Sequence, residues 1–291
     1  MVKRTVVITG ASSGIGKHIA MTFANQGWKV IGTGRNAERI GRVEAQISAT
    51  AGGMDFTMLA SDLSSMADTL ELARQITSLT DRLDLLINNA GAMTAGLVMT
   101  REGLEANFAG NHLGPFLLTQ ELLPLLKRTA RDQAYGAVRI LNTTSDASEM
   151  IPSLDLDDLQ GLARFDPGRA YCTGKLANVI FARALADRID ADGIVAHAVH
   201  PGAVDSNFFS HASPETQERL KHLDKLTEAE GADTLIWLAT APEGAQSNGD
   251  YWHKRARRQP NPTVADRATR DRLWAESEKL IETALRQSDT V

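Results

Sequence analysis

Short, almost continuously apolar runs alternate along the chain with longer segments whose apolar residues lie three or four positions apart. The runs occupy residues 5–9, 28–34, 54–61, 83–90, 137–145, 194–202 and, more briefly, 250–254. Runs apolar on both faces are typical of strands in a parallel sheet covered by helices. The segments with helical spacing are residues 14–26, 36–51, 64–79, 102–130, 171–189 and 265–285. This alternation predicts βαβ units and a doubly wound, mostly parallel, seven-stranded α/β sheet.

The chain shows no internal repeat, linker or low-complexity segment, which predicts one domain over residues 1–291, with residues 255–291 as a C-terminal extension containing a helix. Its 43% hydrophobic and 23% charged residues are typical of a globular protein. The net charge of −5 argues against nucleic acid or an anionic membrane as a partner. No apolar run reaches the roughly 18 residues of a membrane span. With Cys172 the single cysteine, no intramolecular disulfide is possible, and we expect a soluble, cytoplasmic protein.

Three glycines follow the first predicted strand, in the stretch TVVITGASSGIG. Gly10, Gly14 and Gly16 stand at a G-x-x-x-G-x-G spacing, and Ser12 and Ser13 between them add hydroxyl groups. A tight strand-to-helix turn alone would explain one or two of these glycines. At the first such turn of a doubly wound (Rossmann-type) sheet, however, glycines let the phosphates of a dinucleotide approach the backbone and the helix N-terminus. The position therefore favours a dinucleotide site.

The residue after the second predicted strand distinguishes the two nicotinamide dinucleotides. An acidic residue there would hydrogen-bond the ribose 2′-hydroxyl of NAD, but the sequence has Arg35, and no acid before Glu38. A guanidinium can hold a phosphate through two parallel hydrogen bonds. A solvated loop arginine is the alternative interpretation. Given the glycine turn before it, we predict NADP rather than NAD.

Tyr171 and Lys175 lie four positions apart in YCTGK, so one helical face presents both. A tyrosine has a pKa near 10, and a neighbouring ammonium lowers it, which makes the phenol a usable acid or base. Alone, the pair would be read as a surface contact. Ser145, at the end of the fifth predicted strand, adds a hydroxyl at the sheet edge where ligands of parallel sheets bind. The stretches NNAG (88–91) and HPGAVDSN (200–207) end two further strands at the same edge.

Three other features of the sequence give weaker functional signals. The seven histidines show no metal-ligand spacing such as H-E-x-x-H, so we expect no metal. Cys172 has no histidine and aspartate in motif spacing and is interpreted as a packing residue. The basic run KRARR (254–258) is short and lies in an acidic protein, so we interpret it as solvated surface rather than a nucleic-acid site.

Taken together, these motifs resemble those of the short-chain dehydrogenase/reductase family from Thr5 to Leu280. Residues 9–16 match its T-G-x-x-x-G-x-G, residues 88–91 its N-N-A-G, and residues 201–206 its P-G-x-V-x-T with serine in place of the threonine. The resemblance implies a catalytic tetrad of Asn111, Ser145, Tyr171 and Lys175. It also implies the cofactor-binding residues Gly10, Ser12, Ser13, Gly14, Ile15, Gly16, Arg35, Asp62, Leu63, Asn89, Ala90, Gly91, Tyr171, Lys175, Pro201, Gly202, Val204 and Ser206.

The family resemblance also implies the role of each catalytic group. Tyr171 is the general acid/base, Lys175 lowers its pKa and holds the nicotinamide ribose, Ser145 orients the substrate oxygen, and Asn111 anchors a water of the proton path. Hydride passes directly between nicotinamide and carbinol carbon. Family members usually pair through the helices matching residues 102–130 and 171–189, which predicts a homodimer here.

The stretch 102–127, the segment LDLDDL (154–159) and the tail RLWAESEKL (272–280) resemble retinol-dehydrogenase-like and WW-domain-oxidoreductase-like members. Thr143 and Thr144 replace the usual Val-Ser, and Pro115 stands where histidine is frequent, so retinoid specificity stays open. The predicted substrate pocket contains no arginine or lysine and favours an uncharged, hydrophobic ketone or aldehyde and its alcohol. Its candidate residues are Met93, Met150, Ile151, Phe208 and Phe209.

Two alternatives to an NADP-dependent reductase remain on this fold. One is an NAD-dependent alcohol dehydrogenase. The other is a catalytically silent nucleotide sensor or scaffold, whose mark would be the loss of Tyr171, Lys175 or Ser145. All three are present, which favours an enzyme.

Overall fold

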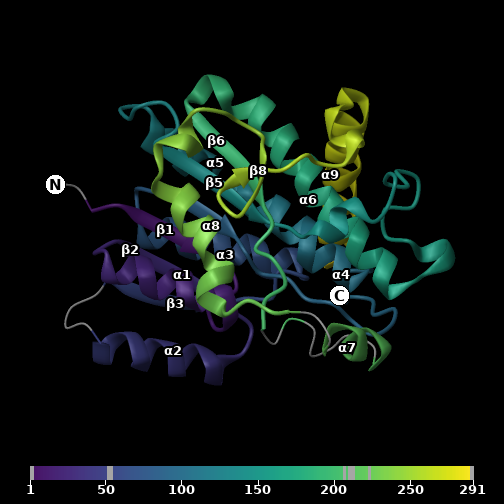
Figure 1. Ribbon diagram of the computed structural model, residues 1–291, viewed down its shortest axis with the longest axis horizontal. Coiled ribbons are helices and arrows are strands. Elements are labelled where there is room, and N and C mark those ends of the chain that lie inside the picture. Colours follow the sequence, from purple (N-terminus) through teal and green to yellow (C-terminus); the bar gives the residue numbers. More distant parts are fainter. Residues whose placement is uncertain (1–2, 51–54, 206–207, 209–213, 222–223, 289–291) are drawn as a thin grey trace.

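The computed structural model describes residues 3–50, 55–205, 208, 214–221 and 224–288. Within these residues one sheet runs through the molecule in the strand order β3-β2-β1-β4-β5-β6-β7-β8 (Figure 1). The first seven strands pair in parallel, which confirms the predicted doubly wound α/β fold. Their bounds are β1 Thr5–Ile8, β2 Lys29–Gly34, β3 Phe56–Ala60, β4 Leu85–Asn88, β5 Val138–Thr143, β6 Ile194–Val199 and β7 Tyr251–His253.

Helices cover both faces of the sheet because neighbouring residues of each strand point to opposite sides. In β1, Val6 and Ile8 pack in a core with α1, α2 and α8, whereas Val7 packs in the larger core under α3, α5, α6 and α9. The helices are α1 Gly14–Asn25, α2 Ala37–Thr50, α3 Met66–Leu79, α4 Ala106–Phe108, α5 Gly114–Ala130, α6 Pro167–Ile189, α7 Pro214–Lys221, α8 Glu228–Thr240 and α9 Arg267–Ser288. Among the described helices, none combines the length and apolarity needed to cross a membrane.

The sequence prediction differs from the structure mainly at helix boundaries. The segment predicted as one helix over 102–130 contains α4, a π-helical turn over Ala109–Leu113, and α5. Helix α6 begins at Pro167, four residues before the predicted start, because Asp166 caps it by accepting a hydrogen bond from the Arg169 backbone N–H at 2.7 Å. Helices α7 and α8 were not predicted, although Thr227 and Glu230 form a capping box that starts α8.

The prediction of seven strands missed β8 (Ala256–Arg257), which pairs antiparallel with β7. Lys254 and Arg255 connect the two strands with φ values of 48° and 58°, the left-handed conformation that two-residue hairpin turns require. Glycine or asparagine normally marks such a turn, so the basic sequence concealed it. The arginines of this run pair with acids of the fold, Arg255 with Asp233, Arg257 with Asp250 and Arg258 with Glu149.

Helix α9 packs on α6 and α3, at the upper right of Figure 1. Its Trp274 ring lies 4.8 Å from the ring of Phe116 on α5 and 5.9 Å from that of Phe181 on α6, between ring centres. Trp274 therefore covers part of the α5 and α6 faces that were predicted for dimerisation. The apolar residues of VIFARALADRI (179–189) are all buried within the single chain.

Candidate active site

The glycine turn joins β1 to α1 at the carboxyl edge of the sheet. Gly10 has a φ of 71°, and a Cβ on Gly16 would lie 2.4 Å from the Gly10 carbonyl oxygen, so neither position admits a side chain easily. Within α1, all of whose residues are described, the N-cap Ser13 makes no side-chain capping bond and the first turn holds no acid. The backbone N–H groups at this helix start, which the Ser13 side chain does not cap, therefore fit an anion such as a dinucleotide phosphate.

Thr9 ties the glycine turn to the NNAG stretch after β4. Its buried Oγ1 accepts hydrogen bonds from the backbone N–H groups of Asn89 and Ala90, both at 2.9 Å. The Asn89 side chain returns a bond to the Thr9 carbonyl at 3.0 Å. These bonds hold two strand ends together under the cofactor position. Thr9 was not among the predicted site residues, although it opens the matching motif.

Arg35 and Asp62 mark the predicted adenosine end. Their side chains lie 4.0 Å apart at the ends of β2 and β3, exposed by 59% and 42%. Asp62 accepts hydrogen bonds from the Ser64 N–H and hydroxyl at 3.0 and 2.8 Å, which fixes its carboxylate. Leu63 is buried in the core. Arg35 and Asp62 are thus too far apart for a direct hydrogen bond, and the Arg35 side chain is exposed.

The stretch after β6 reaches the other end of the glycine turn. Gly202 has a φ of 92°, which turns the chain after half-buried Pro201. Val204 and Ile15 both face Gly231 on α8, where a Cβ would lie 2.4 Å from Val204 and 3.3 Å from Ile15. The predicted cofactor residues Val204 and Ile15 are therefore brought together. Ser206 and Phe209 lie outside the described residues.

Lys175 and Tyr171 lie together on α6. The Lys175 side chain is buried, and its Nζ lies 5.6 Å from the centre of the Tyr171 ring and 5.6 Å from that of Phe208. Burial lowers the pKa of Lys175 to about 8. Burial also raises the pKa of Tyr171, against the lowering effect of its hydrogen bond with Ser145. Burial thus keeps the Tyr171 phenol protonated near neutral pH, which is the state of a proton donor.

Ser145 ends β5 and faces Tyr171. Its Oγ accepts a hydrogen bond from the Ala147 N–H at 3.2 Å and donates to the Asp146 carboxylate at 2.9 Å. Asp146 in turn lies 3.8 Å from Nε2 of His200, whose pKa burial lowers to about 4. Sequence reasoning missed Asp146, whose position beside the serine was the available signal.

Asn111 lies in the π-helical turn between α4 and α5. Its side-chain amide donates to the Ala92 carbonyl at 2.8 Å and accepts from the Ala92 N–H at 3.0 Å. A Cβ on Gly91 would lie 2.7 Å from Oδ1 of Asn111 and 3.4 Å from Nζ of Lys175. Gly91 therefore leaves the space between these two polar groups open. The four predicted catalytic residues converge around this position and Tyr171.

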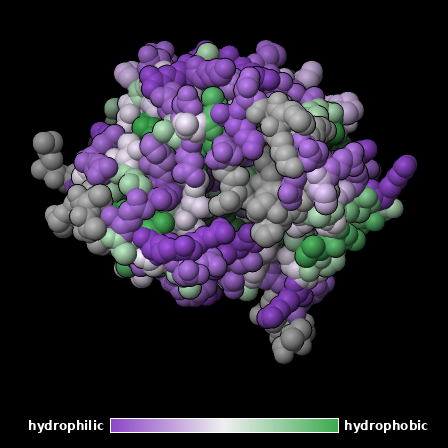
Figure 2. All heavy atoms as spheres, turned by 60° about the horizontal axis from the view of Figure 1, so that its bottom comes forward, coloured by the Kyte–Doolittle hydropathy of each residue, from purple (hydrophilic) through white to green (hydrophobic). Residues whose placement is uncertain are grey.

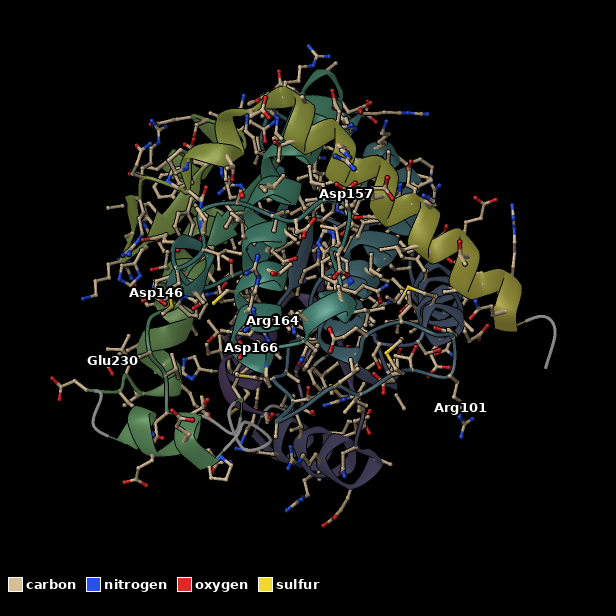
Figure 3. All side chains as sticks on the ribbon, turned by 90° about the vertical axis from the view of Figure 1, so that its right-hand side faces the viewer. Arg101, Asp146, Asp157, Arg164, Asp166 and Glu230 are labelled. Carbon is tan, nitrogen blue, oxygen red and sulfur yellow. The ribbon has the colours of Figure 1, made fainter. Side chains whose placement is uncertain are left out.

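The predicted substrate-pocket residues differ in exposure. Met93 is buried, Ile151 is half-buried, Met150 is 68% exposed, and the Phe208 ring lies 5.6 Å from that of Tyr171. Charged residues also occur on this side of the molecule. Figure 3 shows Asp146, Arg164 and Asp166 on one side, with α9 crossing the view. The face in Figure 2 is mostly hydrophilic, with its broadest hydrophobic group at the lower right and smaller hydrophobic areas elsewhere.

Two further predictions concern metal and cysteine chemistry. In the part of the chain that the structure describes, no group of three or more His, Cys, Asp or Glu side chains is arranged to hold a metal ion. Cys172 lies buried on α6, in keeping with a packing role.

Comparisons with known proteins agree with this geometry. The sequence model of the family described as short chain dehydrogenase matches residues 4–217. The chain is 34% identical over 282 residues to polyprenol dehydrogenase of Mus musculus, covering 95% of this chain and 83% of that protein. It is 33% identical to retinol dehydrogenase 13 of Homo sapiens, over 96% of this chain and 84% of that protein. The solved RhlG/NADP active-site complex of Pseudomonas aeruginosa superposes with a TM-score of 0.69 at 27% identity, covering 91% and 97% of the two chains.

Proposed function

The chain belongs to the short-chain dehydrogenase/reductase family and is an oxidoreductase acting on CH–OH donors, and we propose that it uses NADP to interconvert an apolar ketone or aldehyde and its alcohol. The observation that carries the proposal is the convergence of Ser145 and Lys175 on the half-buried phenol of Tyr171. Bound NADPH supplies the hydride. The protein supplies the proton and the geometry.

Tyr171 gives its phenolic proton to the carbonyl oxygen as reduction proceeds. Ser145 keeps its proton and donates a hydrogen bond to the same oxygen, which requires it to release the Asp146 carboxylate. Lys175 holds positive charge beside the phenol, and charge of that sign stabilises the phenolate left after proton transfer. Asn111 holds the Ala92 backbone next to this group. In the reverse direction the alcohol proton returns to Tyr171.

Arg35 supports NADP as the preferred dinucleotide. It is exposed at the end of β2, and its contact with Asp62, at 4.0 Å, is longer than a hydrogen bond. A 2′-phosphate would offer it a doubly hydrogen-bonded partner instead. NAD-dependent alcohol oxidation is the alternative on the same catalytic residues.

The substrate class is proposed from the apolar side chains nearest Tyr171 and Ser145. Phe208 contacts Tyr171, and Ile151 and Met150 follow the turn after Ser145. Apolar walls with few polar groups select for uncharged, hydrophobic carbonyl compounds. A catalytically silent sensor is disfavoured by the presence of all four catalytic groups. The cytoplasmic location stays a prediction from the sequence.

An NADPH-oxidation screen at 340 nm tests the proposal. The carbonyl panel contains aliphatic, aromatic, steroid and retinoid compounds, with sugar and acyl-carrier ketones as polar controls. We expect turnover with one or more apolar carbonyls, slower turnover with NADH, and turnover lowered by about 100-fold or more in a Tyr171→Phe variant. Preference for a sugar or charged carbonyl would overturn the substrate class alone. Absence of turnover with every carbonyl, and of alcohol oxidation with NADP or NAD, would overturn the enzymatic function.

A further inference from the structure

A buried chain of polar side chains connects α9 to the catalytic Asn111. Ser277 of α9 lies 2.9 Å from Nε2 of His112, and Nδ1 of His112 lies 3.2 Å from Oδ1 of Asn178 on α6. The Asn178 amide then donates to the Asn111 backbone carbonyl at 2.9 Å. Ser277 and His112 have no exposed surface, and Asn178 is 5% exposed. The chain thus joins three segments that are far apart in the sequence.

The π-helical turn explains why this support is needed. Ala109–Leu113 is wound more widely than an α-helix, and such turns interrupt the regular backbone ladder where a functional residue is presented. A buried carbonyl without a partner is costly, and Asn178 provides the donor for that of Asn111. The backbone carbonyl and the side chain of Asn111 are therefore held from opposite sides, by Asn178 and Ala92.

The hydrogen bonds determine the proton positions along the chain. The Asn111 carbonyl can only accept, so the nitrogen of the Asn178 amide must face it and Oδ1 must face His112. His112 therefore carries its proton on Nδ1. Burial lowers the pKa of His112 to about 4, so the ring is neutral and Nε2 is an acceptor. The Ser277 hydroxyl lies 2.9 Å from Nε2 and 2.7 Å from the Leu273 carbonyl, and it has one proton for these two acceptors. Because Nε2 has no proton of its own, the Ser277 proton must point to Nε2 in place of the Leu273 carbonyl.

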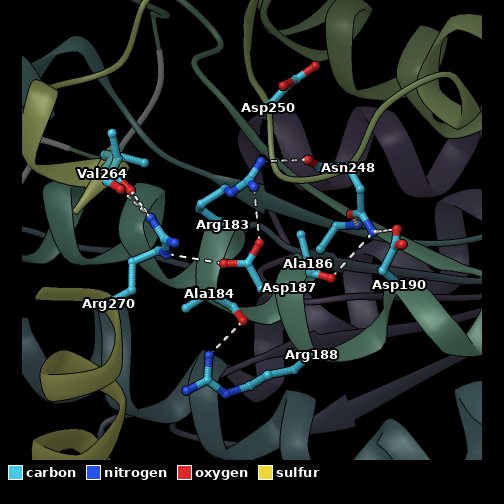
Figure 4. Close-up of polar contacts among 12 residues, drawn as sticks. Arg183, Ala184, Ala186, Asp187, Arg188, Asp190, Asn248, Asp250, Val264 and Arg270 are labelled. Carbon is cyan, nitrogen blue, oxygen red and sulfur yellow. Dashed lines mark hydrogen bonds and ion pairs between the residues drawn. The ribbon is translucent and has the colours of Figure 1, made fainter. Parts of the chain in front are cut away.

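Helix α9 is fixed in place at its start by ion pairs with α6. Asp187 pairs with Arg270 at 3.1 Å and with Arg183 at 3.1 Å, as Figure 4 shows. Arg188 pairs with Asp271 at 3.0 Å and lies over the Trp274 ring, 4.1 Å from its centre. These contacts hold the first turns of α9 at a defined register on α6. Ser277 follows within the same helix and is therefore presented to His112 at a fixed position.

We propose that Ser277 and His112 are positioning residues for the reaction, which set the placement of Asn111 through Asn178. The inference rests on the proposed function for the reaction that Asn111 serves. The hydrogen-bond chain from Ser277 to Asn111 is a feature of the structure and does not depend on that reaction. Helix α9 then supports the position of a catalytic residue in addition to packing on α6. Because the Asn111 side chain lies near Lys175, which neighbours Tyr171, we expect a small displacement to change proton transfer more than the affinity for the cofactor.

A volume-matched pair of variants tests the hydroxyl. Ser277→Thr keeps the donor and Ser277→Val replaces it with a methyl group of the same shape, so any overpacking is common to both. We expect kcat with the best carbonyl to be roughly 10- to 100-fold lower in Ser277→Val than in Ser277→Thr. The Kd for NADPH should agree within about twofold between the two. Thr283→Ala is the control, because Thr283 makes a similar bond to a carbonyl one turn back, Lys279, without touching His112.

The tautomer of His112 provides a readout that does not depend on turnover. Imidazole ¹⁵N chemical shifts, assigned with a His112→Phe variant, should show the proton on Nδ1 in the unmodified protein. Equal kcat values for Ser277→Thr and Ser277→Val, or a proton on Nε2, would overturn the inference. If neither Ser277→Thr nor Ser277→Val folds, the His112 tautomer and the kcat of Ser277→Ala test the inference instead. An unmodified protein with the Nδ1–H tautomer and no turnover would instead count against the proposed function alone.

Discussion

The Lys175 ammonium lies 5.6 Å from the centre of the Tyr171 ring, in a setting where burial raises the pKa of the phenol and lowers that of the amine. Burial disfavours the charged form of each group, so it acts in opposite directions on an acid and a base. Near neutral pH, Tyr171 is thus protonated and can donate its proton. Lys175 is still charged there but loses its charge as the pH rises through about 8. This relationship underlies the first two predictions.

Removing the Tyr171 hydroxyl should abolish proton donation and leave the fold intact. We expect Tyr171→Phe to lower kcat/KM by about 10²-fold or more, with an unchanged Kd for NADPH. Tyr135→Phe is the control, since Tyr135 is an exposed tyrosine that bonds Asp190 instead. Steady-state kinetics and NADPH fluorescence titration measure both quantities. Retention of most of the activity would show that another group supplies the proton.

The carbonyl reduction rate should fall as pH rises through about 8. Lys175 is protonated below its lowered pKa of about 8 and neutral above it, so the positive charge beside Tyr171 is lost on the alkaline side. We expect kcat/KM for reduction to be level near neutral pH and to decline above 8. In Lys175→Arg, whose guanidinium stays charged, the decline should move to higher pH even if the rate is lower throughout. If kcat/KM declines at the same alkaline pH in both proteins, Lys175 is not the cause of the decline.

The parts of the fold and site that depend on local pattern were predictable from sequence. Apolar runs placed the seven parallel strands, and motif spacing located Gly10, Ser145 and Tyr171 at one sheet edge. What the sequence did not reveal depends on distant contacts. Ser277 and His112 are 165 positions apart, and nothing in either local sequence indicates that they meet. The β7–β8 turn was missed because Lys254 and Arg255 adopt a backbone conformation that their residue types seldom take.

Arg35 should determine the choice between NADPH and NADH. Hydrogen bonds to charged groups contribute about 1.5–3 kcal/mol, which predicts at least tenfold tighter binding of NADPH to the unmodified protein. Arg35→Asp should remove or reverse this preference, because a carboxylate repels the 2′-phosphate and accepts from a ribose hydroxyl. Arg74→Asp makes the same charge change at an exposed position of α3 and controls for long-range electrostatics. Equal Kd values for both cofactors in the unmodified protein would contradict the assignment.

The full chain should be a monomer. The dimer expected from the family would pair through α5 and α6, but Trp274 of α9 packs on Phe116 and Phe181, and the apolar side chains of 179–189 are buried within one chain. A partner at this face would have to displace α9. Light scattering at micromolar concentration should therefore give a mass near 31.5 kDa. A mass of twice that value would mean that the chain pairs through another surface or that α9 moves away.

Acid should destabilise the protein through His112 well before its carboxylates are protonated. The pKa of His112 is about 4 in the folded chain and near 6.5 when unfolded, so between these values the unfolded chain binds more protons. Folding stability is then greatest above pH 6.5 and is lost as pH falls toward 4. For this group alone, linkage gives a loss of about 2 kcal/mol between pH 7 and pH 5. Urea unfolding at the two pH values measures it. His112→Phe, which keeps an aromatic ring among Phe108, Phe116 and Phe181, should reduce the difference by about that amount, whereas His18→Asn on α1 should not. An unchanged difference in His112→Phe would mean that His112 accepts its proton without unfolding the chain.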